Sequence, residues 1–335
     1  MTPRTNTPSA TNATNAANAT NATNATNATN ASESGTELGQ SGCILVGYGP
    51  EDRGRGGLGL ARMLAQSADM PVVVACVVPD RWGSISPARQ ADADYQRYLR
   101  GLADESLRTA AEEFAGATVP VRYEVVTARS SPSGLTAAGE RYGAKILVLG
   151  SSSDGAWGHI ALGSVSDHLL HSSRIPIALA PRGQRCTPAQ RVERVTVAVD
   201  GSEASRAVLT RAASVAATVG AQLRIVSFAV RTATMYPSEL GLNIEDRVVA
   251  EWRVQAERIV REVASGLDVM GQGEPELHVA QGKSWAEALE EPGWDEGDVL
   301  VIGSSSTEPR LARVFLGSTA TRITRHSPVP VIVVP

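Results

Sequence analysis

The chain has 335 residues, of which 42% are apolar and 20% are charged, and its formal net charge is −4. This composition can supply a hydrophobic core, but it lacks the excess of basic residues that attracts nucleic acid or an anionic membrane, so we expect neither as a partner. No run of 18 apolar residues occurs, so no transmembrane helix is predicted.

Residues 1–41 form a leader built around the low-complexity tract "TNATNAANATNATNATNATNAS". The tract has no bulky apolar side chains whose burial could offset the loss of conformational entropy on folding. We therefore expect the leader to be disordered and to take no part in the folded core.

The remainder of the chain repeats itself. The segment "KILVLGSSS" at 145–153 recurs as "DVLVIGSSS" at 298–306, and "LGSVSDHLLHSSRIPIALAP" at 162–181 recurs as "LGSTATRITRHSPVPVIVVP" at 316–335. Self-similarity at an almost constant offset is the sign of a tandem duplication. The predicted organisation is a first domain at 42–183, a linker at 184–193 and a second domain at 194–335. The polarity of the linker and its Pro188 favour an exposed connection.

Apolar runs and helical periodicity alternate within each half. In the first domain, strands are expected near 43–48, 71–78, 120–126, 145–149 and 175–180. In the second, strands are expected near 194–199, 221–229, 276–280, 298–303 and 330–334, with helices near 203–219, 244–265, 284–290 and 317–326. Ser202 or Ser205 can cap the first of these helices. Continuously apolar strands such as 299–302 belong in a parallel sheet covered on both faces, which predicts two doubly wound, five-stranded, Rossmann-like α/β domains.

After the first strand, Gly54, Gly56 and Gly59 form the pattern G-x-G-x-x-G. Read literally, this predicts a dinucleotide-dependent oxidoreductase with Asp80 as the ribose ligand. When the two halves are aligned, however, the three glycines fall inside the first helix, and the strand-to-helix turn is 49–52. Because no catalytic group follows and the second half repeats the fold, this enzyme remains a remote alternative.

A doubly wound sheet binds its ligand beyond the carboxyl ends of its strands, where the strand order reverses. In the second domain these positions carry Asp200 and Gly303, and a helix follows at Gly317 and Ser318. The start of a helix offers free N–H groups to phosphate, and a carboxylate can accept hydrogen bonds from a ribose or a base. The residue types therefore predict a nucleotide site.

The motifs "VAVDGSEAS" and "LVIGSSS…LGSTATRITRHSPVPVIVVP", together with the first half's "ILVLGSSS…LGSVSDHLLHSSRIPIALAP", resemble the universal stress protein family over nearly all of 43–335. The resemblance implies an adenine nucleotide alpha-hydrolase-like fold and a stress-response protein that binds ATP or AMP without dedicated catalysis. ATP-binding members carry G-x2-G-x9-G-[ST] after the fourth strand and an Asp after the first.

Each half of the chain departs from this pattern. Serine replaces the middle glycine in both halves, the second half has one extra residue before Gly317, and the first half has Gly49 at the aspartate position. Serine there would strain a left-handed backbone, but it is harmless where φ stays negative. We expect the second domain to bind better because it keeps its aspartate. The candidate nucleotide-binding residues are Asp200, Gly201, Gly303, Ser306, Gly317, Ser318 and Thr319 in the second domain, and Gly150, Ser153, Gly163, Ser164 and Val165 in the first.

Two further expectations concern metals and partners. His168 and His171 are three residues apart on a helix, but no third ligand lies near them in the sequence, so a solvated helix face is predicted and no metal site. The closing segments "IPIALAP" and "VPVIVVP" would be exposed apolar edges if unpaired, which favours pairing between the halves, a homodimer, or both. An alternative function is a nucleotide-independent dimerisation or interaction module with a protein partner that the sequence does not identify.

The three cysteines, Cys43, Cys76 and Cys186, are odd in number and lack C-x-x-C spacing. Neither a disulfide framework nor a zinc site is therefore predicted. Cys43 and Cys76 lie at or within apolar runs, where we expect reduced core thiols and hence a reducing, cytoplasmic compartment.

Overall fold

The computed structural model describes residues 42–49, 54–80, 89–230, 242–266, 273–304 and 317–335. The expected disorder of the leader lies outside these residues, and so does Ser306 among the candidate site residues. Within the described part of the chain, none of the helices is both long and apolar enough to cross a bilayer.

Ten strands form one sheet in the order β3-β2-β1-β4-β5-β10-β9-β6-β7-β8. The first domain contributes β1 (Cys43–Gly47), β2 (Val72–Pro79), β3 (Val121–Ala128), β4 (Ala144–Gly150) and β5 (Ile177–Ala180). The second contributes β6 (Arg194–Ala198), β7 (Gln222–Val230), β8 (Glu276–Gly282), β9 (Asp298–Gly303) and β10 (Val331–Val334). Each half has the doubly wound order predicted from the sequence, with parallel neighbours throughout.

The two halves meet through their closing strands. β5 and β10 pair antiparallel, with Ile332 opposite Ala178. This pairing confirms the expected contact between the closing segments, and it merges the two five-stranded sheets into one. Neither closing strand keeps an open edge, which removes the risk that an apolar edge would carry.

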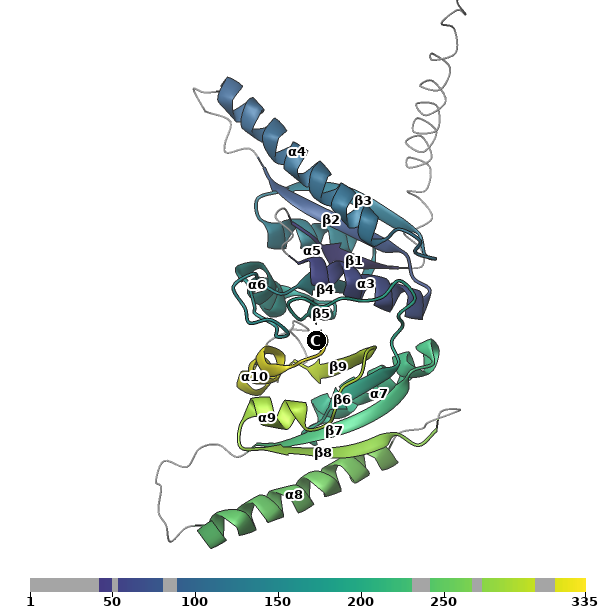
Figure 1. Cartoon of the computed structure of the whole chain (residues 1–335), viewed down its shortest axis with the longest axis vertical. Coiled ribbons are helices and arrows are strands. Elements are labelled where there is room, and N and C mark those ends of the chain that lie inside the picture. Colours follow the sequence, from purple (N-terminus) through teal and green to yellow (C-terminus); the bar gives the residue numbers. More distant parts are fainter. Residues whose placement is uncertain (1–41, 50–53, 81–88, 231–241, 267–272, 305–316) are drawn as a thin grey trace, which may run out of the picture. The chain divides into compact units, whose positions relative to one another are not determined.

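Helices cover both faces of the sheet (Figure 1). One face is covered by α3 (Arg55–Ala68), α4 (Arg89–Glu113), α7 (Glu203–Val219) and α8 (Leu242–Ser265). The other is covered by α5 (Ser131–Arg141), α6 (Ser164–Ser172), α9 (Trp285–Glu290) and α10 (Ser318–His326). Alternate residues of a strand enter the two cores: Ile44 and Val46 lie in one and Leu45 in the other. Burial on both faces explains why these strands are continuously apolar.

The ends of α7 show how local sequence sets a helix. Ser202 is its N-cap, and its hydroxyl accepts a hydrogen bond from the N–H of Ser205 at 3.2 Å, which confirms the predicted cap. Gly220 ends the helix in the left-handed region, at φ 72°, where glycine has no steric penalty.

The glycine pattern after β1 serves helix packing. Gly56 and Gly59 lie inside α3 as predicted, but placing Gly54 inside the helix was wrong: Gly54 is the N-cap, with φ 90°. A Cβ atom on Gly56 would lie 3.0 Å from the carbonyl oxygen of Pro181, and one on Gly150 would lie 2.2 Å from the Cα of Gly54. The glycines thus let the start of α3 lie directly on the carboxyl end of β4, which accounts for the pattern without a dinucleotide.

Most of the linker is exposed, as its composition suggested, but part of it packs against the fold. Pro188 is exposed, but Cys186 and Val192 are buried. The guanidinium of Arg62 on α3 donates a hydrogen bond to the carbonyl oxygen of Cys186 at 2.5 Å, and the N–H of Val192 donates to the hydroxyl of Ser67 at 2.8 Å. Two buried residues thus anchor an otherwise exposed linker on α3, where some of its backbone groups find hydrogen-bond partners.

Candidate functional site

An open cavity of about 840 Å³ lies at the carboxyl ends of β1 and β4, where the strand order of the first domain reverses. We call it the strand-end cavity. Its lining includes all five candidate residues of the first domain, namely Gly150, Ser153, Gly163, Ser164 and Val165. The structure therefore brings these residues together at the position where a doubly wound sheet binds its ligand.

One end of the strand-end cavity is formed by the start of α6. Gly163 is the N-cap in an extended conformation, with φ −81°, and no side chain caps the helix. A Cβ atom on Gly163 would lie 3.6 Å from the Cβ of Ser152, which is an ordinary contact. Since the protein itself does not require glycine here, its small size leaves room for a ligand beside the first N–H groups of the helix.

The serine that replaces the middle glycine is unstrained. Among the described residues, the only non-glycine residue with positive φ is Asp69, so Ser153 does not lie in the left-handed region. Its hydroxyl lies 3.3 Å from a carboxylate oxygen of Asp154, and both side chains are exposed in the cavity. The substitution thus costs no backbone strain, but a carboxylate stands where phosphate would have to approach.

The opposite end of the cavity is apolar, and the sequence analysis missed it. Ala75 and Val77 from β2 and Leu135 from α5 line this end, together with Ser131 at the start of α5. Parallel neighbouring strands end at the same edge of a sheet, so the end of the second strand was the signal that could have identified these residues.

Gly49 lies at the edge of the strand-end cavity, where the aspartate position of the first domain was expected. A Cβ atom added to it would meet no atom of the described residues within 4 Å. The cavity therefore has space for a carboxylate at this position but does not carry one.

Asp200 in the second domain is exposed and folds back on the start of α7. Its Oδ1 atom accepts a hydrogen bond from the N–H of Ser202 at 2.9 Å. Partial burial raises the pKa of the Asp200 carboxyl, but hydrogen bonds from Ser202 and Ser205 outweigh this effect and hold the pKa below its ordinary value. Asp200 is therefore ionised at neutral pH and is held at the strand end as an acceptor.

The other candidates of the second domain lie at the corresponding strand and helix ends. Gly303 is the last residue of β9, and Gly317 is the extended N-cap of α10, with φ −67° and with Ser318 and Thr319 in the first turn. Gly201 has φ 83°, which favours glycine. The segment that carries Ser306 lies outside the described residues, so the link between Gly303 and Gly317 is not part of this description.

Two aromatic residues stand at the apolar end of the second domain's site. By strand register Phe228 corresponds to Val77, and by the matching helix caps Trp285 corresponds to Ser131. The rings of Phe228 and Trp285 lie 6.0 Å apart between centroids, inclined at 54°. The indole Nε1 of Trp285 is buried and has no hydrogen-bond partner in the described part of the chain. The second domain thus has two aromatic side chains where the first has Val77 and Ser131.

Comparison with known proteins identifies the family. The model of the universal stress protein family matches residues 43–181 and again residues 191–335. The chain belongs to the universal stress protein family. It is similar to the universal stress proteins Rv2319c of Mycobacterium tuberculosis (strain H37Rv) and Mb2346c of Mycobacterium bovis, each 36% identical over 296 residues, covering 87% of this chain and 99% of the relative.

Solved structures of universal stress proteins share the fold. One from Archaeoglobus fulgidus has a TM-score of 0.53 at 22% identity, covering 88% of this chain and 98% of that chain. A putative universal stress protein from Pseudomonas aeruginosa has a TM-score of 0.52 at 17% identity, covering 89% and 95%. At these identities the likeness shows the tandem α/β fold, and the chemistry of the site has to be argued from this chain's own residues.

The remaining sequence candidates carry no site chemistry. His168 and His171 are exposed on α6, as predicted, and Nε2 of His171 lies 3.9 Å from Oδ1 of Asp167. Among the residues that the structure describes, no group of three or more His, Cys, Asp or Glu side chains could hold a metal ion.

Proposed function

We propose that this universal stress protein binds an adenine nucleotide, ATP or AMP, at the carboxyl ends of its strands, and that it acts in the cytoplasm as a nucleotide-responsive stress factor. The observation that carries the proposal is the strand-end cavity, whose lining joins an uncapped helix start to an apolar end. A cavity of about 840 Å³ falls within the usual size range of sites for small molecules and cofactors.

In the proposed binding mode, the phosphates lie at the start of α6 or of α10, and the base lies at the apolar end of the site. The N–H groups of Ser164 and Val165, and of Ser318 and Thr319 in the second domain, point along the helix axis toward the phosphates. The base then contacts Val77 in the first domain or the Phe228–Trp285 pair in the second.

We propose that the second domain binds the nucleotide more tightly. Asp200 is ionised and exposed, and since a carboxylate has about four acceptor positions, the bond to Ser202 leaves several for a ribose or base. The first domain has Gly49 at that position and places the carboxylate of Asp154 near the phosphate end instead. The first difference removes an acceptor for the ribose or base, and the second repels phosphate. Both therefore lower the affinity of the first domain for a nucleotide.

We also propose that the protein has no dedicated catalytic function. No lysine, arginine or histidine is among the described residues that line the strand-end cavity. Phosphoryl transfer depends on cations or fixed donors that stabilise charge on the transferring group. Any hydrolysis of ATP in this cavity is therefore expected to be slow.

A second candidate function is an interaction module that needs no nucleotide, with a second copy of the chain or another protein as its partner. Two observations favour it: the carboxylate of Asp154 at the phosphate end, and the β5–β10 pairing, whose contacts are made by the two strands themselves. Under this alternative, the starts of α6 and α10 are ordinary helix ends.

The decisive experiment is calorimetric titration of the purified protein with ATP and AMP, together with chromatography of any nucleotide released on denaturation. Gly163→Asp and Gly317→Asp block the phosphate end of one domain each, and aspartate is a favourable N-cap in the extended conformation that both glycines adopt, so the helices are retained. We expect Gly317→Asp and Asp200→Ala to remove the tighter binding, Gly163→Asp to affect only weaker binding, and Asp104→Ala, an exposed control on α4, to change neither. Absence of binding heat and of released nucleotide for the unmodified protein would favour the interaction module.

A further inference from the structure

A second open cavity, of about 750 Å³, lies between the start of α3, the loop after β4 and the first residues of the linker. We call it the linker cavity. It shares Gly54 and the Ser151–Ser153 segment with the strand-end cavity, but its remaining lining is different and takes no part in the function proposed above.

The linker cavity is basic. Arg55, Arg182 and Arg185 line it together with a single acid, Glu113, so positive charges exceed negative charges by two. The strand-end cavity has the opposite sign, because Asp154 is its one charged lining residue among those described. A concave surface lined by charges of one sign concentrates ligands of the other sign. The linker cavity is therefore suited to an anion.

The buried Arg62, which contacts two residues of the lining, adds a further positive charge beside the linker cavity. Arg62 is 4% exposed, and its guanidinium donates hydrogen bonds to the carbonyl oxygens of Glu113 and Cys186, both of which line the cavity. Its Nε is buried and has no hydrogen-bond partner among the described residues. The Glu113 carboxylate is shared between Arg62, at 3.6 Å, and Arg55, at 3.7 Å. One carboxylate thus faces two guanidinium groups, which leaves Arg182 and Arg185 to face the cavity.

Trp157 gives the same cavity an aromatic surface. Its side chain is 70% exposed, which is unusual for a large ring in a folded domain. One side of the ring is nevertheless fixed: the guanidinium carbon of Arg182 lies 6.0 Å from the ring centroid, and a Cβ atom on Gly183 would lie 2.3 Å from a ring carbon. A held ring with exposed area is a surface on which a planar group can stack.

The loop that carries these groups is preorganised. The guanidinium of Arg182 donates to the carbonyl oxygen of Gly155 at 2.5 Å, and its backbone N–H donates to the carbonyl oxygen of His159 at 2.9 Å. The N–H of Gly158 in turn donates to the carbonyl oxygen of Arg182 at 2.9 Å. Because the loop's own side chains and backbone make these bonds, a bound ligand would have to order few further groups.

We propose that the linker cavity binds a polyphosphate chain, either free or carried by a nucleotide, through Arg55, Arg182 and Arg185. Guanidinium groups bind phosphate oxygens through paired, charge-assisted hydrogen bonds, so several arginines in one cavity favour a ligand with several phosphates. Where the chain is carried by a nucleotide, the base stacks on Trp157. The site lies where the first domain meets the linker, so a bound ligand would contact the segment that joins the two domains.

The test is a fluorescence titration of the full chain with inorganic tripolyphosphate, carried out on the unmodified protein and on the double variant Gly163→Asp/Gly317→Asp, in which the phosphate ends of both strand-end sites are blocked. We expect a saturable change in tryptophan fluorescence that weakens with added salt and is lost in Trp157→Phe. Arg185→Glu should weaken binding by about tenfold or more, because it removes a charge-assisted contact and adds repulsion. Arg211→Glu, an equivalent change at an exposed position on α7, should leave the affinity unchanged. Arg55→Gln provides a second variant whose loss of charge should weaken binding.

The same titration distinguishes a free polyphosphate from one that is carried by a nucleotide. If ATP binds more tightly than tripolyphosphate and Trp157→Ala removes the difference, the ligand is a nucleotide. If the two affinities are equal, the cavity recognises the polyphosphate alone. Adenosine has no phosphate, so any response to it should not change in Arg185→Glu. The proposal is overturned if tripolyphosphate gives no saturable response with the folded protein, or if Arg185→Glu and Arg211→Glu behave alike. Gly163→Asp should leave tripolyphosphate binding intact, so failure of the strand-end site and failure of the linker cavity give different results.

Discussion

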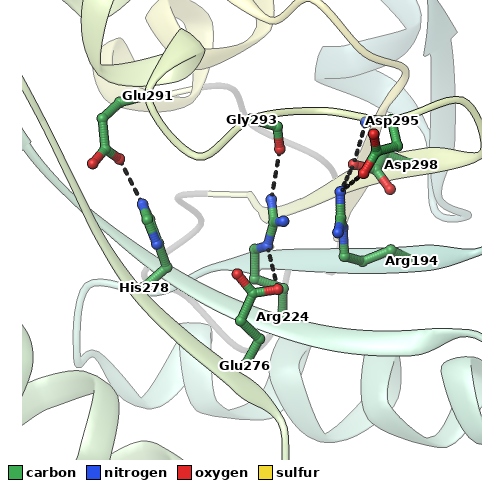
Figure 2. Close-up of polar contacts among 8 residues, drawn as sticks. All are labelled: Arg194, Arg224, Glu276, His278, Glu291, Gly293, Asp295 and Asp298. Carbon is green, nitrogen blue, oxygen red and sulfur yellow. Dashed lines mark hydrogen bonds and ion pairs between the residues drawn. The ribbon is translucent and has the colours of Figure 1, made fainter.

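The Nη2 atom of Arg194 lies 2.6 Å from Oδ2 of Asp298 and joins the first residue of β6 to the first residue of β9 (Figure 2). The Asp298 side chain is 1% exposed, and the same guanidinium lies 2.9 Å from Oδ2 of Asp295. The N–H of Asp295 also donates to Oδ2 of Asp298 at 3.0 Å. One arginine thus fixes both the strand pair and the loop that leads into β9.

The neighbouring strands hold the same loop in a similar way. The Nε atom of Arg224 on β7 lies 3.0 Å from Oε2 of Glu276, and its Nη1 atom lies 3.0 Å from the carbonyl oxygen of Gly293 (Figure 2). The guanidinium carbon of Arg224 also lies 5.8 Å from the ring centroid of Trp294. His278 on β8 contacts Glu291 at 2.5 Å. Three basic side chains on successive strands therefore bind the segment between α9 and β9, away from the carboxyl ends where the candidate site lies.

Asp298→Ala should lower the free energy of unfolding by about 3 kcal/mol, because it leaves the guanidinium of Arg194 without its buried partner. The measurement is the midpoint of urea unfolding. The control is Glu262→Ala, which breaks the exposed 2.7 Å pair with Arg206 and should cost less than about 1 kcal/mol. Equal losses in the two variants would mean that the Arg194–Asp298 pair contributes no more than a surface contact.

Asp200 should contribute stability that depends on pH. Its pKa is lower in the folded protein than in the unfolded chain, so its contribution is fully present above the unfolded pKa, about 3.9, and is lost as the pH falls through the folded value. The difference in urea midpoint between the unmodified protein and Asp200→Asn should therefore be largest at neutral pH and should shrink in acid. A difference that stays constant with pH would contradict the hydrogen bonds from Ser202 and Ser205 as its cause.

Sequence reasoning succeeded where the signal is local. The period of apolar residues and the cap at Ser202 identified α7 at 203–219, because both depend on residues a few positions apart. The expected start of the fifth strand at 175 was two residues early: β5 begins at Ile177, since Pro176 has no N–H to donate to a neighbouring strand. The repeat then placed both domains.

The rest depended on contacts that no local pattern encodes. Arg62 and Cys186 are 124 positions apart, and their hydrogen bond is what packs the linker on α3 and shapes the linker cavity. Gly54 was placed inside the helix because it aligns with Ser205, the third residue of α7, and a helix start that lies three residues later in one half does not show in an aligned repeat. The apolar end of the strand-end cavity was missed because its residues come from two further elements of the sheet and its cover.

The three thiols should be unreactive in the folded protein. Burial raises the pKa of Cys43 to about 11, and burial with the nearby Asp104 carboxylate raises that of Cys76 to about 11. Burial also raises the pKa of Cys186. All three are free and buried, which confirms the expectation for Cys43 and Cys76. A thiol reagent at about pH 8 should label them only after unfolding, since the thiolate is the reactive form; rapid labelling of the native protein would contradict their burial.

Substitutions at two glycines at the edge of the strand-end cavity should differ in their effect on stability. Gly150→Ala places a Cβ 2.2 Å from the backbone of Gly54, so α3 must shift, and we expect a clear loss of thermal stability. The Cβ atom of Gly49→Asp meets no atom of the described residues within 4 Å, so this variant should fold normally. If the missing carboxylate is what weakens the first domain, Gly49→Asp should raise its affinity for ATP in the calorimetric titration, measured in the Gly317→Asp background to silence the other site. An unchanged affinity would mean that Asp154, and not Gly49, limits binding there.

The pairing of β5 with β10 should couple the two domains in hydrogen exchange. Val333 lies opposite Ile177, and both side chains are fully buried at the point where the two halves meet. In the unmodified protein, the backbone amides of both strands should exchange as slowly as those of β1. Val333→Asp places an unpaired carboxylate in this contact, so exchange should accelerate in β5 of the other domain while β1 stays protected. Val215→Asp, the same change at a side chain that is 57% exposed on α7, should leave β5 slow. If Val333→Asp accelerated exchange in β10 alone, the closing strands would be independent edges of two separate sheets, and the antiparallel pair would not be what joins the halves.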